Sequence, residues 1–160
     1  KRRGWRYDGP NSRLDVDVDG TTVARFDDST GVDVRTGDLT VQSGNLDMVA
    51  GTLDIQDGGT VAQLTNRTTA VTSNTYAGKI TTQATSLAAV TIVTHTVNNS
   101  LVAATDNIII TKVSGDADTS AFVTAMAAGS FNVSLRNHHA SGADTTAFVY
   151  NFALIKSAIT

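Results

Sequence analysis

The 160-residue sequence predicts an all-β protein, in which an N-terminal intertwined β stem precedes a C-terminal, jelly-roll-like β-sandwich head. All fifteen acidic residues are Asp and Lys is scarce, although Glu and Lys normally fill exposed helix faces. Thr, Val, Ile, Asn, Asp and Gly are abundant instead, and these residues favour strands and turns. The single Pro leaves the chain free to form sheets, and without Cys no disulfide contributes to the fold.

The first segment, residues 1–12, is interpreted as a basic and aromatic anchor. The first seven residues carry a charge of +4, so a net charge of −3 leaves −7 for the rest of the chain. Trp, Tyr and Arg are the residue types that dominate interface hot spots, which makes Arg3, Trp5, Arg6 and Tyr7 candidates for docking on a partner protein. An untethered tail is the alternative, and the acidic remainder argues against nucleic-acid binding.

The second segment, residues 13–60, is predicted to form a β-rich stem. RLDVDVDG alternates apolar and acidic residues, which is typical of a half-buried strand. TTVARFDDSTGVDVRT then places apolar residues on either side of the turn signal DDSTG. These patterns predict short strands that lead into a repeat.

The repeat consists of three seven-residue blocks, GDLTVQS (37–43), GNLDMVA (44–50) and GTLDIQD (51–57). Each block follows the pattern Gly-x-Leu-x-apolar, and a coiled coil is excluded because its apolar positions need spacings of three and four. A spacing of two instead places both side chains on one face of a strand, and the recurring Gly permits a turn. The apolar pairs form the predicted trimer stem core: Leu39, Val41, Leu46, Met48, Leu53 and Ile55.

Such a stem cannot bury its apolar residues within one chain, because a lone strand leaves one face and both edges open. Copies of the same chain that wrap around a common axis would cover these residues and pair the strand edges. The repeat therefore predicts a homotrimer.

The third segment, residues 61–160, is predicted to be the sandwich head. Turn signals separate seven candidate strands at 69–74, 79–84, 88–98, 106–113, 120–128, 130–138 and 145–156, and this spacing is typical of a β-sandwich. Within the fifth, AFVTAMAA could instead form a short helix. The expected core consists of Val90, Ile92, Ile108, Ile110, Phe122, Phe131, Val133, Leu135, Phe148, Phe152 and Leu154.

The head also resembles a family of proteins. The order TNRTTAVT (65–72), AGKIT (77–81), VAATDNIIIT (102–111), AAGSFNVSLRN (127–137) and FVYNFALIK (148–156) resembles a C-terminal β-domain of phage tail-fibre and virion decoration proteins. The resemblance covers roughly residues 60–160. It implies a location on the surface of the phage particle, trimerisation and an exposed head, and it assigns no functional residue.

Candidate metal sites are weak, and no cofactor is expected. DVDVDG (15–20) imitates the start of a calcium loop, but the twelfth position is Phe26 instead of an acidic ligand. Asp116 and Asp118 fit a turn better than a calcium site. His138 and His139 could meet their copies on a three-fold axis, yet a polar hairpin tip is the simpler interpretation, and His95 is expected to be structural.

The function predicted from these features is non-enzymatic. The chain is expected to be a trimeric fibre or capsid decoration subunit that docks on a phage capsid or tail protein and stabilises the capsid, attaches to the host, or both. No catalytic motif is present, and a tailspike hydrolase fragment is a rival because Asp could supply paired carboxylates. The other alternative is a carbohydrate-binding adhesin that recognises a host glycan. No apolar run is long enough to span a membrane as a helix.

Overall fold

The computed structural model describes residues 3–8, 13–18, 21–27, 31–34, 53–55 and 57–157, and all its secondary structure in these ranges is β. The chain divides into two compact units, Lys1–Thr52 and Leu53–Thr160. The all-β prediction is confirmed for the described residues.

The first unit contains one antiparallel four-stranded sheet in the order β1-β2-β3-β4. Its strands are β1 (Arg3–Asp8), β2 (Arg13–Val18), β3 (Thr21–Asp27) and β4 (Gly31–Val34). The predicted strand over RLDVDV is therefore confirmed as β2, which pairs with β3. The sequence predicted no strand in residues 1–12, whereas β1 pairs with β2 along its whole length.

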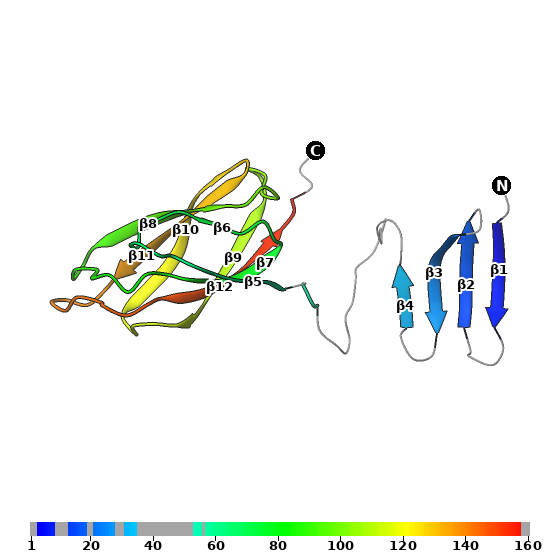
Figure 1. Ribbon diagram of the computed structural model, residues 1–160, viewed down its shortest axis with the longest axis horizontal. Helices are drawn as coiled ribbons and strands as arrows, with labels where there is room; N and C mark the ends of the chain where they lie inside the picture. The colour runs from blue at the N-terminus through cyan, green and yellow to red at the C-terminus, as the bar shows by residue number, and fades with distance from the viewer. Residues whose placement is uncertain are drawn as a thin grey trace. The chain divides into compact units, whose positions relative to one another are not determined.

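The second unit is a sandwich of two mixed four-stranded sheets (Figure 1). One sheet has the order β5-β7-β12-β9, with strands β5 (Asp57–Ala62), β7 (Ala77–Thr81), β12 (Val149–Ile155) and β9 (Asn107–Ser114). The other has the order β10-β11-β8-β6, with strands β10 (Thr119–Ala127), β11 (Ser130–Asn137), β8 (Ile92–Asn98) and β6 (Val71–Thr72). Each sheet contains one parallel pair, β5 with β7 and β6 with β8.

The core lies between the two sheets and is formed by alternate residues of the long strands. Along β12, Tyr150, Phe152 and Leu154 are buried, because successive side chains of a strand point to opposite faces. The buried apolar residues are Val71, Ile80, Leu87, Val97, Val102, Phe131, Val133, Leu135, Phe148, Tyr150, Phe152 and Leu154. Six of the predicted core residues are in this set, and Ile108 and Ile110 pack against it.

For three of the predicted core residues the prediction of burial is wrong. Val90, Ile92 and Phe122 are 60%, 52% and 39% exposed. Val90 lies in the turn before β8 and has a left-handed φ of 57°. Ile92 and Phe122 lie in strands, but their register directs them outward, since Phe122 pairs with Ser134 and Ile92 with Arg136. Hydrophobicity does not distinguish the two faces of a strand when both carry apolar residues.

The helix considered over AFVTAMAA is also wrong, because this segment forms most of β10. A bulge between Val123 and Ala125 lets β10 keep its pairing with β11. The segment contains the aromatic Phe122 and the β-branched Val123 and Thr124, which favour a strand. Pairing with β11 outweighs the helix propensity of its alanines.

The strand β5 was not predicted from the sequence. Its Gly58 lies so close to the next segment that an added Cβ would be 2.1 Å from Thr75 Oγ1 and 2.3 Å from the carbonyl oxygen of Ala77. A glycine-rich DGGT segment suggests a turn, whereas here the missing side chain allows close approach of two chain segments.

Candidate interaction surfaces

The outer face of the sheet β5-β7-β12-β9 carries an apolar patch. Ala77, Ala153 and Ile109 lie side by side in one row across β7, β12 and β9. Ile155 follows two residues after Ala153 on the same face of β12. Ile109 and Ile155 are 53% and 45% exposed. These four residues are called the apolar patch below.

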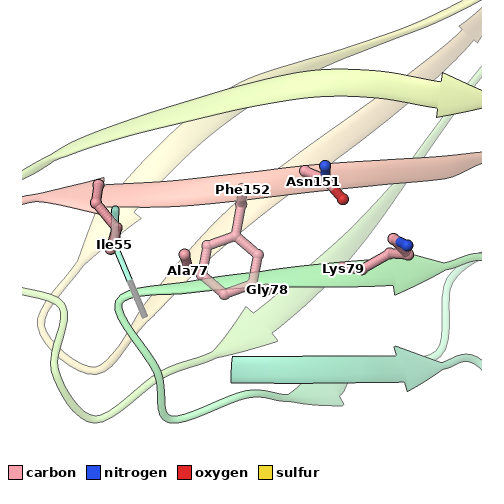
Figure 2. Close-up of a pocket in the computed structure, with 6 residues that line it drawn as sticks. All are labelled: Ile55, Ala77, Gly78, Lys79, Asn151 and Phe152. Carbon is pink, nitrogen blue, oxygen red and sulfur yellow. The ribbon is translucent and has the colours of Figure 1, made fainter. Parts of the chain in front are cut away.

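The segment that precedes β5 reaches this same face. Ile55 lines a pocket of about 240 Å³ together with Ala77, Gly78, Lys79, Asn151 and Phe152 (Figure 2). An added Cβ at Gly78 would be 3.0 Å from the ring of Phe152, its partner on β12, so this glycine leaves room for the aromatic ring. The pocket places Ile55 beside Ala77, at the edge of the apolar patch, and Leu53 before it is 73% exposed.

Of the predicted stem core, the structure thus describes Ile55, which lies at this pocket, and Leu53, which is exposed. The other four, Leu39, Val41, Leu46 and Met48, lie outside the described residues. Arg3, Trp5, Arg6 and Tyr7 lie on β1, whose backbone pairing is described while its side chains are not.

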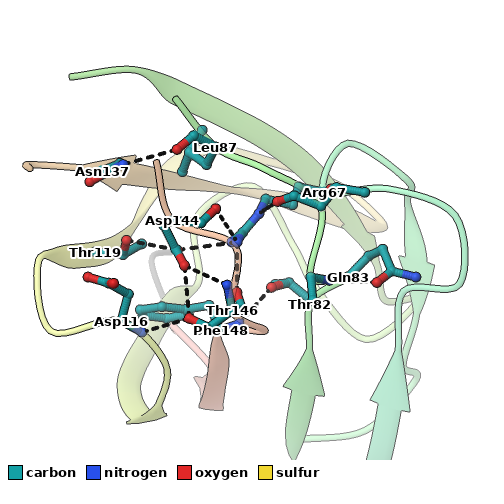
Figure 3. Close-up of polar contacts among 12 residues, drawn as sticks. Arg67, Thr82, Gln83, Leu87, Asp116, Thr119, Asn137, Asp144, Thr146 and Phe148 are labelled. Atoms are coloured by element: carbon teal, nitrogen blue, oxygen red, sulfur yellow. Dashed lines mark hydrogen bonds and ion pairs between the residues drawn. The ribbon is translucent and has the colours of Figure 1, made fainter. Parts of the chain in front are cut away.

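A buried ion pair lies among the connections at one end of the sandwich (Figure 3). Arg67 Nη2 is 3.2 Å from Asp144 Oδ2, and both side chains are almost inaccessible. Arg67 also donates to the carbonyl oxygens of Thr85 and Thr146, at 2.6 and 2.7 Å. Asp144 accepts bonds from the Thr119 hydroxyl and from the backbone N–H and hydroxyl of Thr146. These five residues form what is called the polar clasp below.

The clasp keeps Asp144 ionised. Burial by itself raises the pKa of Asp144, but the bonds from Thr146 and Thr119 and the charge of Arg67 outweigh burial and hold this pKa below its ordinary value. The clasp joins three connecting segments to Thr119, the first residue of β10. Arg67 lies before β6, Thr85 lies before β8, and Asp144 and Thr146 lie before β12. Most of its polar atoms are satisfied within the fold, which indicates a structural role.

A second buried polar pair, His95 and Tyr150, crosses the core between β8 and β12. His95 Nε2 is 2.7 Å from the Tyr150 hydroxyl oxygen. Burial lowers the pKa of His95 to about 4 and raises the pKa of Tyr150, so both groups are neutral at pH 7. The sequence predicts a structural His95, and its burial against Tyr150 agrees with this prediction.

The candidate metal ligands of the head each have a partner within the fold. His138 Nε2 bonds the hydroxyl of Ser120 at 2.7 Å, and His139 Nδ1 accepts the backbone N–H of Gly142 at 2.7 Å. The Asp118 backbone N–H donates to Asp116 Oδ1 at 2.8 Å, as in the predicted turn. Within the described residues, no group of three or more His, Cys, Asp or Glu side chains could hold a metal ion.

No sequence pattern predicts the apolar patch, the polar clasp or the His95–Tyr150 pair. Arg67 and Asp144 are 77 positions apart, so no local motif connects them. No helix in the described part of the chain has the length and apolar character needed to cross a membrane. No family model, curated protein or solved structure matches this chain.

Proposed function

We propose that this chain is the subunit of a homotrimeric phage structural protein, a fibre or capsid decoration protein that displays a β-sandwich head on the particle surface. The virion location rests on the resemblance of residues 60–160 to phage tail-fibre and decoration domains. The assembly rests on one observation, that the apolar patch is continuous with the point where the repeat segment enters the head.

This continuity supports a trimer for a physical reason. An exposed apolar surface is energetically unfavourable in water, at roughly 25 cal/mol for each Å² that could be buried, and contiguous exposed apolar patches commonly mark interaction sites. The repeat arrives at Ile55, beside Ala77 of the patch. If three repeats wrap around one axis, three heads leave that axis with their apolar patches close to it. Copies of the same chain are therefore the partners that the patch fits.

The test is the solution mass of the full chain, measured by light scattering at micromolar concentration. We expect three times the chain mass of 16.7 kDa for the wild type. Ile109→Asp introduces a charge into the patch and is expected to shift the mass towards the monomer, since an unpaired buried charge is strongly unfavourable.

Ile92→Asp is the matched control, because Ile92 is 52% exposed and Ile109 is 53% exposed, but Ile92 lies on the other sheet. This variant is expected to keep the wild-type mass. A monomeric wild type would contradict the proposed assembly. If Ile109→Asp and Ile92→Asp have the same solution mass, the apolar patch is not part of the interface.

A further inference from the structure

The outer face of the other sheet, β10-β11-β8-β6, has a different chemistry. His95 and Val97 of β8 are buried, so the alternate residues Thr94 and Thr96 face outward. The register aligns Phe122, Ser134 and Thr94 in one row across β10, β11 and β8. The exposed ring of Phe122 therefore stands beside a surface of hydroxyl groups.

These hydroxyl groups are held in place by bonds to one another. Ser134 Oγ lies 2.7 Å from Thr94 Oγ1 and 3.2 Å from Thr124 Oγ1. In the neighbouring row the Thr96 hydroxyl donates to Asn132 Oδ1 at 2.9 Å. Ser134 is buried and links its two neighbours, whereas Thr94 and Thr124 are exposed. A hydroxyl group has one donor and two acceptor positions, so these two threonines keep hydrogen-bonding capacity towards solvent. The result is a set of ordered hydroxyl groups on the same face as one exposed aromatic ring.

A single formal charge accompanies this surface. Arg136 is the only Lys, Arg or Asp in the four strands of the sheet. It is exposed, it lies between Ser120 and Ile92 in the row next to Phe122, and within the described residues it forms no ion pair. A planar guanidinium binds a carboxylate through two parallel hydrogen bonds, so this face is complementary to a group with one negative charge.

We propose that this face, centred on Phe122 and Arg136, binds an oligosaccharide that contains a carboxylated sugar. One side of a pyranose ring presents C–H bonds, which pack on the electron-rich face of an aromatic ring. The sugar hydroxyl groups would exchange hydrogen bonds with Thr94, Thr124 and Asn132, and the carboxylate would pair with Arg136. The proposal goes beyond the assembly role, because it concerns the sheet opposite to the apolar patch.

The experiment uses the full chain on a glycan array that carries matched neutral and carboxylated oligosaccharides, followed by calorimetric titration of the strongest ligand. We expect carboxylated glycans to bind preferentially. Phe122→Ala and Arg136→Gln are each expected to weaken the affinity by at least about fivefold while the oligomeric mass is unchanged.

Tyr76→Ala is the matched control, because Tyr76 is also an exposed aromatic residue, at 48%, but it precedes β7 of the other sheet. This variant is expected to bind like the wild type. A silent array, a preference for neutral glycans, or equal losses in Phe122→Ala and Tyr76→Ala would each overturn the proposal. Thermal unfolding of every variant separates a loss of binding from a loss of fold.

Discussion

At the residue scale, two polar side chains of the core, His95 and Tyr150, are both neutral in the folded protein at pH 7. His95 and Tyr150 share one hydrogen bond across the sandwich, at 2.7 Å. An imidazolium in this position would lose its hydration without gaining a counter-ion. Burial therefore lowers the pKa of His95 to about 4, and the protein keeps this residue neutral when it is folded.

This shift predicts how stability depends on pH. Between pH 6.5 and about 4, the unfolded chain binds a proton at His95 that the folded chain does not, so stability is lost as pH falls through this range. One such proton changes the free energy of unfolding by about 1.4 kcal/mol per pH unit. His95→Gln is expected to flatten this slope in chemical unfolding at a series of pH values.

The exposed His138, immediately after β11, provides the control for this prediction. His138→Gln also removes a histidine but leaves the His95–Tyr150 pair intact, so the loss of stability attributed to His95 is expected to persist. A wild-type slope in His95→Gln would mean that other groups cause the loss of stability in acid.

Val90 shows how one turn residue misleads a prediction from hydrophobicity. It stands immediately before the apolar residues of β8, but its φ of 57° places it in a left-handed turn and directs its side chain towards solvent. A β-branched residue rarely adopts this conformation. The turn is closed instead by the Thr91 hydroxyl, which donates to the carbonyl oxygen of Ala88 at 2.7 Å.

At the scale of the elements, the polar clasp fixes the connections that separate the strands. Loops usually satisfy their backbone groups with water, whereas here a buried guanidinium replaces water at the carbonyl groups of Thr85, Asp144 and Thr146. Asn137 adds bonds to the carbonyl groups of Leu87 and Gly142, at 3.0 and 2.9 Å. The long segments before β8 and before β12 are thereby tied to the sandwich.

Removing the cation from the clasp is expected to be costly. Arg67→Gln leaves Asp144 buried without its counter-ion, and loss of one partner of a buried ion pair typically destabilises a protein by about 3–5 kcal/mol. Arg136→Gln makes the same chemical change on an exposed face and is expected to alter stability by no more than about 0.5 kcal/mol. Urea unfolding measures both. Similar changes in the free energy of unfolding in the two variants would show that the clasp contributes little to stability.

At the scale of the whole molecule, the outer faces of the two sheets of the head carry different exposed side chains. The outer face of β5-β7-β12-β9 combines Ile109 and Ile155 with small residues. The outer face of β10-β11-β8-β6 combines hydroxyl groups with Phe122 and Arg136. A sandwich whose two outer faces differ in this way fits a subunit that assembles through the first face and meets a ligand through the second.

The proposed docking on the particle predicts a phenotype for the anchor segment. Trp5→Ser combined with Tyr7→Ser is expected to reduce binding to purified phage particles by at least about tenfold, since Trp and Tyr supply much of the energy of an interface. Substitution is preferred to deletion because β1 forms the edge of its sheet and pairs with β2. Co-sedimentation with isolated capsids and tails measures the binding and identifies the docking partner.

Tyr76→Ser in the head serves as the control for co-sedimentation and is expected to bind like the wild type, because Tyr76 lies in the other compact unit. Unchanged binding of the Trp5/Tyr7 variant would exclude the anchor role of residues 1–12.

The sequence by itself determined the all-β class, because composition, alternation and turn residues act locally on the chain. It also indicated six of the buried core residues, such as Phe131 and Leu154. Only the tertiary structure decided which face each strand turns inward, as for Phe122, and which distant groups meet, as for Arg67 and Asp144. Both depend on strand register and on pairing between segments far apart in the chain, which local patterns do not encode.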